Sequence, residues 1–310
     1  MSRTLSVIVP VRDGERFIAD ALTSLLRNAR DDFEYIVVDD GSVDHTRAVA
    51  ESFQAELPGL TVLSSPTPGG PSRARNLGMA AASGTYLTFL DGDDWYAPGY
   101  LPELVAAMER TACDFVRVDH IRVHGTRREV HRAPERRRWR VLAPRDGITR
   151  GMVDYPMPWA GIYHRRLLDW GVLTFPEHLQ TAEDRAWIWR LHRLASSYAV
   201  APLAGVFHRR GVPSSLTQIG DERQLHFFDA YLGVIDDLAG EDPALVGKAV
   251  YNLCALTVYH HRLRGRLVPH VRELLDQRTR ATLRALPPAV LAETLPRLGP
   301  AREALLRRFL

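Results

Sequence analysis

The architecture of this chain is set by residues 85–94, which read Thr85-Tyr86-Leu87-Thr88-Phe89-Leu90-Asp91-Gly92-Asp93-Asp94. The aromatic and branched residues of the first half are typical of a buried β-strand, which we predict at residues 85–90. Three carboxylates within the next four residues repel one another, so the cluster is costly unless a cation or solvent offsets its charge. The segment therefore predicts a buried strand with an acidic loop at its carboxyl end.

Upstream of this segment, short apolar runs alternate with amphipathic stretches. We predict strands at residues 5–11, 33–39 and 60–63, and helices at residues 15–28, 44–56 and 72–83. This alternation is typical of βαβ units, and it indicates an α/β fold with a mostly parallel sheet flanked by helices. In open sheets of this kind, ligands bind beyond the carboxyl ends of the strands. We therefore expect the loops at residues 10–14, 40–42 and 91–94 to form one site.

The regular alternation of predicted strands and helices ends in the second half of the chain. We predict strands at residues 115–123 and 161–164 and a helix at residues 183–194. The region from residue 221 to residue 310 has a helical pattern throughout, interrupted by prolines. These patterns predict a domain at residues 1–220 followed by a C-terminal helical region at residues 221–310, which could shape the acceptor site or form a homo-oligomer.

Composition excludes several classes of protein. The 40 basic and 37 acidic residues give a formal net charge of +3, too small to argue for nucleic acid, and we expect no nucleic-acid partner. Cys113 and Cys254 cannot make a disulfide framework, which favours a reducing compartment. No run of about 18 apolar residues is present to span a membrane. We expect a cytoplasmic protein, with peripheral contact at the inner face of the membrane left open.

Basic residues concentrate between Arg127 and Arg140. A cluster of this kind is more often a solvated face than a binding site. It could also favour an anionic acceptor or a negatively charged membrane surface. The sequence leaves these alternatives open.

The acidic loop suggests a metal. Mg²⁺ or Mn²⁺ prefers oxygen ligands, keeps several waters, and usually completes its shell with substrate phosphates. Aspartates of this loop could therefore hold a cation that bridges to a diphosphate. The alternative is a solvated Asp-Gly turn. In the second loop, Asp40 could accept a hydrogen bond from the imide N–H of a uracil, or it could simply favour a tight turn.

Two competing enzyme classes lack their signatures. There is no G-x-G-x-x-G after the first strand, which argues against a dinucleotide-binding oxidoreductase. A sugar-phosphate nucleotidyltransferase predicts a glycine-rich basic signature at the same place, and residues 10–16 do not supply it.

Four motifs, in order and spacing, resemble the family-2 glycosyltransferases. They are Ser6-Val7-Ile8-Val9-Pro10-Val11, Ile36-Val37-Val38-Asp39-Asp40-Gly41-Ser42-Val43-Asp44, Ala74-Arg75-Asn76-Leu77-Gly78-Met79 and Phe89-Leu90-Asp91-Gly92-Asp93-Asp94. The resemblance covers about residues 5 to 217. It implies a GT-A fold, a nucleotide-diphospho-sugar donor, Mn²⁺ or Mg²⁺ as cofactor, and inversion at the anomeric carbon.

The resemblance also implies roles for individual residues on the donor side. Asp93 would be the principal metal ligand, and Asp91 would face the ribose and the metal. The residues expected to bind the nucleotide sugar in the first four motifs are Pro10, Val11, Arg12, Asp40, Arg75, Asp91 and Gly92. This chain departs from the family at Arg12-Asp13, where an aromatic residue followed by asparagine is common, which weakens the assignment of UDP over other nucleotides.

The acceptor side resembles the family at residues 159–168, at residues 175–177 and at Glu183-Asp184. Inversion by direct displacement requires a carboxylate to take the acceptor proton. By resemblance Asp184 is that base, with Glu183 as its fallback. Alternatively, both residues only stabilise the start of a helix, worth about 0.3–1 kcal/mol, with Thr181 as its cap.

A late segment, residues 207–217, resembles a further family motif of basic residues followed by hydroxyl groups. It implies that Arg209 and Ser215 contact the diphosphate, since guanidinium groups make paired charge-assisted bonds to phosphate. His208 would be a further metal ligand. A solvated basic loop is the alternative.

These observations predict a glycosyltransferase that uses a nucleotide-diphospho-sugar, with UDP as the expected nucleotide. The expected acceptor is a hydroxyl of a glycan, a lipid-linked glycan or an anionic polymer. A non-catalytic nucleotide-sugar-binding scaffold with the same fold is the alternative from a different class. That alternative predicts a degraded acidic loop or a degraded Glu183-Asp184 pair, and both are intact.

Overall fold

The computed structural model describes residues 3–212, 216 and 218–310. The chain forms two compact units: unit 1 comprises Met1–Glu177 and Arg190–Val212, and unit 2 comprises His178–Trp189 and Pro213–Leu310. The division expected at residue 220 stays a prediction.

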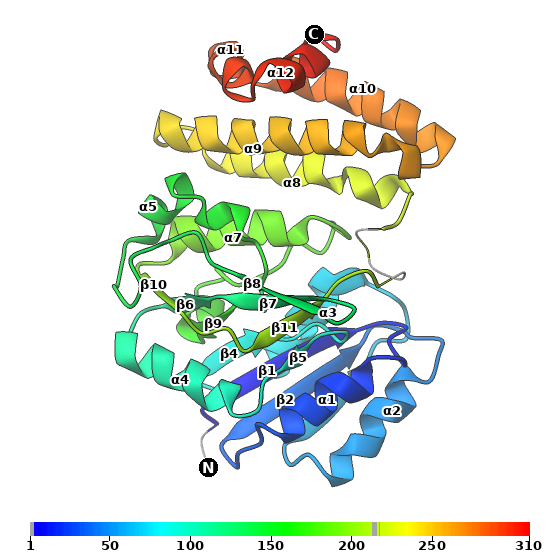
Figure 1. The fold of residues 1–310 in the computed structure, drawn as a ribbon, viewed down its shortest axis with the longest axis vertical. Coiled ribbons are helices and arrows are strands. Elements are labelled where there is room, and N and C mark those ends of the chain that lie inside the picture. Colours follow the sequence, from blue (N-terminus) through cyan, green and yellow to red (C-terminus); the bar gives the residue numbers. More distant parts are fainter. Residues whose placement is uncertain (1–2, 213–215, 217) are drawn as a thin grey trace. The chain divides into compact units, whose positions relative to one another are not determined.

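Unit 1 is built on a seven-stranded, mostly parallel sheet in the order β10-β6-β9-β4-β1-β2-β3 (Figure 1). Its strands are β1 (Leu5–Val11), β2 (Phe33–Asp39), β3 (Leu60–Ser64), β4 (Tyr86–Phe89), β6 (Phe115–Val118), β9 (Gly161–His164) and β10 (Tyr198–Ala201). β1 pairs in parallel with both β2 and β4, whereas β9 runs antiparallel to β4 and β6. The carboxyl ends of β1, β2 and β4 therefore lie at the same edge of the sheet.

Helices flank this sheet, as the amphipathic stretches predict. They are α1 (Ile18–Leu26), α2 (Thr46–Ser52), α3 (Gly70–Ala81), α4 (Tyr100–Thr111), α5 (Pro144–Thr149) and α6 (Arg166–Asp169), with short 3₁₀ turns at η1 (Phe53–Ala55) and η2 (Met152–Asp154). A glycine lets α3 approach the sheet closely, because a Cβ at Gly78 would lie 2.4 Å from Cγ2 of Ile8. The predicted α/β class is confirmed, and the core lies between the sheet and its helices.

A second, four-stranded sheet in unit 1 has the order β5-β11-β7-β8. Its strands are β5 (Trp95–Tyr96), β7 (His120–His124), β8 (Arg127–His131) and β11 (Val206–Arg209). The single strand expected at residues 115–123 is therefore wrong, because the chain leaves the large sheet at Asp119. The Asp119 carboxylate is buried, accepts the N–H of Ala133 at 2.9 Å and pairs with Arg138. An apolar pattern does not reveal such a change of sheet.

The basic cluster lies on β8 and the chain after it. β8 is an edge strand, and Arg127 and Arg128 are exposed on it. Farther along, Arg137 forms an ion pair with Glu135 at 2.8 Å. Some arginines of the cluster are thus paired with carboxylates inside the fold, whereas Arg127 and Arg128 form an exposed basic edge.

Unit 2 is helical. Its helices after residue 220 are η3 (Glu222–Leu225), α8 (His226–Asp237), α9 (Pro243–Arg262), η4 (Arg264–Arg266), α10 (Pro269–Ala285), α11 (Pro288–Arg297) and α12 (Pro300–Arg307), and α7 (Glu183–Leu194) contributes to both units. Each of the last four α-helices begins with a proline, whose fixed φ suits the first turn. The C-terminal helical region is confirmed, and prolines start its last four α-helices. Within the described part of the chain, no helix combines the length and the apolarity needed to cross a bilayer.

Candidate active site

The acidic loop follows β4, and its last carboxylate has a structural role. The Asp94 side chain is fully buried. Its Oδ1 accepts the backbone N–H of Arg209 at 2.7 Å, and its Oδ2 lies 3.1 Å from Nδ1 of His208. Asp94 therefore fastens the acidic loop to β11, a role that its place in a run of aspartates does not reveal.

Asp91 and Asp93 are the two carboxylates that remain for a ligand. Asp91 is part-exposed, and its Oδ1 accepts a hydrogen bond at 3.0 Å from the buried Arg75 guanidinium. Burial, together with the nearby charges of Asp94 and Asp91, raises the pKa of Asp93 to about 7. A site whose ionised form is disfavoured in this way would be stabilised by a cation.

The residues present fit a divalent cation that is shared with a ligand. Among the residues that the structure describes, no three His, Cys, Asp or Glu side chains form a metal-binding group. Two carboxylates suit Mg²⁺ or Mn²⁺, which take one or two protein carboxylates and fill the remaining positions with water and phosphate oxygens. Nδ1 of His208 faces Asp94, and its Nε2 lies 3.3 Å from Arg210. The metal-ligand role of His208 stays a prediction.

Gly92 lets the acidic loop touch the end of the first strand. A Cβ at this position would lie 2.7 Å from Cγ2 of Val11 and 2.9 Å from its Cβ. Any larger residue would push the two loops apart, so the glycine is required by this close approach.

The loops after β1 and β2 are joined by backbone-to-side-chain hydrogen bonds. The N–H of Asp13 donates to Oγ of Ser42, and the N–H of Val43 donates to Oδ1 of Asp13, both at 2.9 Å. The N–H of Gly14 donates to Oγ1 of Thr46 at 2.8 Å. Two similar bonds link Glu15 to Asp44 and His45. These bonds tie the two predicted base-binding loops to each other.

Asp13 has φ +49°, in the left-handed region where aspartate is tolerated.

Asp40 is buried at the end of β2. Its Oδ1 accepts the N–H of Gly69 at 2.8 Å, and its Oδ2 accepts the N–H of Gly70 at 2.7 Å. These N–H groups therefore hold Asp40 in place. A carboxylate has about four lone-pair sites, so Asp40 can still accept from a ligand. Its own N–H donates to the carbonyl of Val11 at 2.9 Å, which places Pro10 and Val11 beside it.

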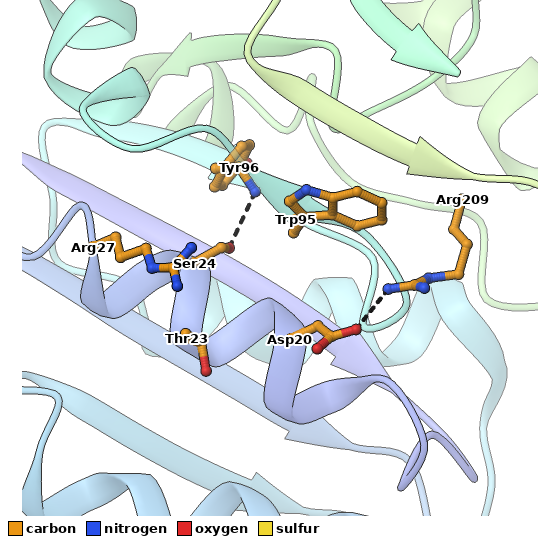
Figure 2. A pocket seen from close by; sticks show the side chains of 7 residues that line it. All are labelled: Asp20, Thr23, Ser24, Arg27, Trp95, Tyr96 and Arg209. Carbon is orange, nitrogen blue, oxygen red and sulfur yellow. Dashed lines mark hydrogen bonds and ion pairs between the residues drawn. The ribbon is translucent and has the colours of Figure 1, made fainter. Parts of the chain in front are cut away.

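Arg209 is turned toward helix α1. Its Nε donates to the carbonyl of Asp93 and its Nη2 donates to Oδ2 of Asp20, both at 2.8 Å. The guanidinium carbon lies 4.6 Å from the ring centroid of Phe17 and 4.7 Å from that of Trp95. Figure 2 shows this side chain and Asp20 at the edge of a shallow pocket of about 340 Å³.

Arg209 therefore holds the backbone of the acidic loop, and sequence reasoning offers no signal for its bond to α1. Its predicted contact with a diphosphate stays a prediction. Arg12 is exposed and its Nε lies 3.4 Å from Oδ2 of Asp13. Ser215 lies outside the described residues.

The predicted catalytic base lies in unit 2, at the first turn of α7. The helix begins at Glu183, as predicted. Ala182 before it has φ +58°, a left-handed conformation that costs a non-glycine residue about 1–3 kcal/mol and that often occurs at functional sites. The hydroxyl of Thr181 donates to the carbonyl of Arg223, and its capping of α7 stays a prediction. Asp184 is more exposed than the buried Glu183, which favours Asp184 as the base.

Comparison with known proteins identifies the family. The model of the family "Glycosyl transferase family 2" matches residues 6–168, a span that contains the four motifs between Ser6 and Asp94. The chain belongs to glycosyl transferase family 2.

Among its relatives is the uncharacterized glycosyltransferase EpsJ of Bacillus subtilis, 30% identical over 69% of this chain and 63% of EpsJ. Another is the poly(ribitol-phosphate) beta-N-acetylglucosaminyltransferase TarS of Staphylococcus aureus, 27% identical over 63% of this chain and 33% of TarS. The matched regions thus span less than two thirds of either relative. The crystal structure of S. aureus TarS 1–349 in complex with UDP-GlcNAc superposes with a TM-score of 0.78 at 22% identity, covering 99% of this chain and 88% of that one. This likeness confirms the fold.

Proposed function

We propose that this chain is a metal-dependent, inverting glycosyltransferase. It transfers a sugar from a nucleotide-diphospho-sugar to a hydroxyl of a cell-surface glycan, a glycolipid or an anionic polymer. The observation that carries the proposal is the acidic loop at the carboxyl end of β4, where Asp91 is held by Arg75 and the charge of Asp93 is disfavoured. A cation and a diphosphate would relieve that cost.

UDP is the proposed nucleotide. The TarS structures include complexes with UDP and with UDP-GlcNAc, which supports uridine here. Asp40 lies beside Pro10 and Val11 and keeps lone pairs that can accept the imide N–H of uracil. Because the loops around it are hydrogen-bonded to one another, these loops need little reorganisation on binding.

The reaction requires a positive charge beside the leaving diphosphate and a base that removes the proton of the acceptor hydroxyl. A divalent cation held by Asp91 and Asp93 would supply positive charge to the departing diphosphate. Asp184 takes the proton of the acceptor hydroxyl as its oxygen attacks the anomeric carbon from the face opposite the nucleotide, and the configuration inverts. Arg209 keeps the acidic loop in position through the carbonyl of Asp93.

The acceptor is proposed on charge. The exposed arginines of β8 favour an anionic polymer or a lipid-linked acceptor at the inner face of a membrane. TarS acts on poly(ribitol-phosphate), an anionic polymer, which supports this class. The proposed location is cytoplasmic, with peripheral contact at the membrane, and the helices of unit 2 are the proposed surface for a homo-oligomer.

A thermal-shift panel tests the proposal. UDP, GDP, ADP and CDP are compared with and without Mn²⁺, because stabilisation grows with ligand concentration relative to Kd. We expect the largest shift with UDP and Mn²⁺ together. No shift with any nucleoside diphosphate in the presence of Mn²⁺ would contradict the proposal.

A further inference from the structure

Asn76 on α3 binds the backbone of a segment far away in the sequence. Its Nδ2 donates to the carbonyl of Phe175, and its Oδ1 accepts the N–H of Phe175, both at 2.9 Å. The same Nδ2 donates to Oε1 of Glu177 at 2.9 Å. Only an amide side chain offers a donor and an acceptor in this arrangement. Asn76 therefore fixes residues 175–177 against α3.

The ring of Phe175 connects the same segment to the acidic loop. It packs edge-on against Phe89 of β4, with ring centroids 5.6 Å apart. The guanidinium carbon of Arg75 lies 5.2 Å from the centroid of the Phe175 ring, and Arg75 also binds Asp91. Two consecutive residues of α3 thus hold two different segments: Arg75 holds the acidic loop and Asn76 holds residues 175–177.

We propose that Asn76 is a positioning residue, an inference that rests on the proposed function. It couples nucleotide binding at the acidic loop to the conformation of the segment Phe175–Glu177. This segment continues through residues 178–182 to Glu183 and Asp184, the proposed base. A nucleotide diphosphate that orders Asp91 also orders Arg75 and the ring against it. Through its hydrogen bonds to Phe175, Asn76 then restricts the motion of the segment's backbone. Such coupling is reciprocal, so a fixed segment also favours nucleotide binding.

The chain contains a matched control for a purely structural amide. Asn28 is buried, and its Nδ2 donates to the carbonyls of Ser24 and Ala97 at 2.8 and 2.9 Å. Its Oδ1 accepts the N–H of Leu101 at 3.0 Å. Asn28 therefore makes the same kind of two-sided backbone contact between α1 and the start of α4.

The experiment is hydrogen exchange by mass spectrometry on the full chain, with and without UDP and Mn²⁺. Wild type, Asn76→Ala, Asn76→Asp and Asn28→Ala are compared. In wild type, UDP with Mn²⁺ is expected to slow exchange at residues 89–95 and at residues 175–177. In Asn76→Ala, exchange at residues 175–177 is expected to be about fivefold faster, as for one lost hydrogen bond, and its response to UDP is expected to disappear. Protection at residues 89–95 persists when UDP and Mn²⁺ are saturating, and Asn28→Ala keeps both responses.

Asn76→Asp has almost the same shape and keeps the acceptor for the Phe175 N–H, but it cannot donate to the carbonyl. It carries the test if circular dichroism shows that Asn76→Ala is unfolded, and it is expected to lose most of the UDP response at residues 175–177. If the folded Asn76 variant keeps wild-type protection at both segments, the coupling is overturned. Absence of any UDP response at residues 89–95 in wild type contradicts the proposed function instead.

Discussion

Asp94 and Arg209 are joined by a hydrogen bond of 2.7 Å from the Arg209 backbone N–H to the buried carboxylate of Asp94. The bond fastens β11 to the acidic loop, and the Arg209 side chain adds a second attachment at the carbonyl of Asp93. The loop that is proposed to hold the metal is therefore shaped by a strand that lies more than a hundred residues later in the sequence.

Asp94→Ala is expected to destabilise the protein by about 1–3 kcal/mol, because it leaves a buried N–H without its acceptor. Asp94→Asn keeps an acceptor for the Arg209 N–H and is expected to cost less. Urea unfolding of both variants measures the difference. Equal stability of Asp94→Ala and wild type would show that this bond contributes nothing.

Asp93→Asn is expected to abolish sugar transfer and to remove the Mn²⁺-dependent part of the UDP stabilisation, since one of the two proposed metal ligands is lost. For wild type at UDP concentrations near 100 times Kd, the stabilisation is about 2.7 kcal/mol, and addition of EDTA is expected to reduce it similarly. Thermal unfolding in UDP, with Mn²⁺ or with EDTA, measures both. Ligand-free Asp93→Asn must melt at or above the melting temperature of ligand-free wild type for the comparison to hold, because the charge of Asp93 is disfavoured without a cation.

Asp184→Asn is expected to lower turnover by about 10²–10⁴-fold, the usual contribution of a general base, while UDP binding stays unchanged. The measurement is UDP release from UDP-GlcNAc with poly(ribitol phosphate) as the first acceptor probe. Glu183→Gln is the matched neighbour and is expected to retain most activity. Near-normal turnover of Asp184→Asn would show that the base is misassigned.

Asp13→Ala is expected to weaken UDP binding and to destabilise the protein by about 1–3 kcal/mol. It loses the bond to the N–H of Val43, worth about 1 kcal/mol, and places alanine at a positive φ that aspartate tolerates better. Asp13→Asn keeps the acceptor and tolerates the same φ, so it is expected to behave like wild type. Calorimetric titration with UDP and Mn²⁺ compares the three proteins, and equal affinities would contradict a positioning role for Asp13.

His192 is expected to contribute to acid sensitivity. It is fully buried between Phe115 and Tyr198, and burial lowers its pKa to about 3. In the unfolded chain His192 has an ordinary histidine pKa of about 6.5, so below that pH it binds a proton that the folded state does not bind. Stability is therefore unaffected above about pH 6.5 and falls between pH 6.5 and pH 3, by up to about 1.4 kcal/mol per pH unit.

His192→Phe is expected to reduce this slope, at the cost of the Nδ1 hydrogen bond to the Pro144 carbonyl at every pH. Replacement of the exposed His124 by asparagine serves as control. Urea midpoints between pH 7 and pH 4 provide the measurement, and parallel curves for His192→Phe and wild type would refute the assignment.

Much of the secondary structure follows from local patterns. The strands at residues 5–11, 33–39 and 161–164 and the helix at residues 183–194 have the predicted bounds. Their signals are strong because a buried parallel strand is almost continuously apolar and an amphipathic helix repeats every turn. The break at Asp119 was not predicted, because the apolar pattern of β6 continues into β7 although the two strands belong to different sheets.

The site divides in the same way. The aspartates of the acidic loop could be recognised in the sequence, because metal chemistry demands carboxylates at a strand end. The motif around Asn76, which lies in α3, could be recognised only by its resemblance to the family. Which of the three aspartates of the acidic loop is buried could not be recognised, since it depends on β11, more than a hundred residues later. The partners of Arg209 and Asn76 are equally remote in the chain.

The amino-acid order alone was enough to specify the α/β class, the acidic loop and the family resemblance, because these depend on local patterns and on the order and spacing of those patterns along the chain. Only the folded chain decided that Asp94 anchors while Asp91 and Asp93 remain for a ligand, that Asp13 ties two loops together, and that Asn76 holds Phe175. Each of these assignments is a contact between segments brought together by sheet pairing and helix packing, and the burial that changes a carboxylate's chemistry exists only once those segments meet.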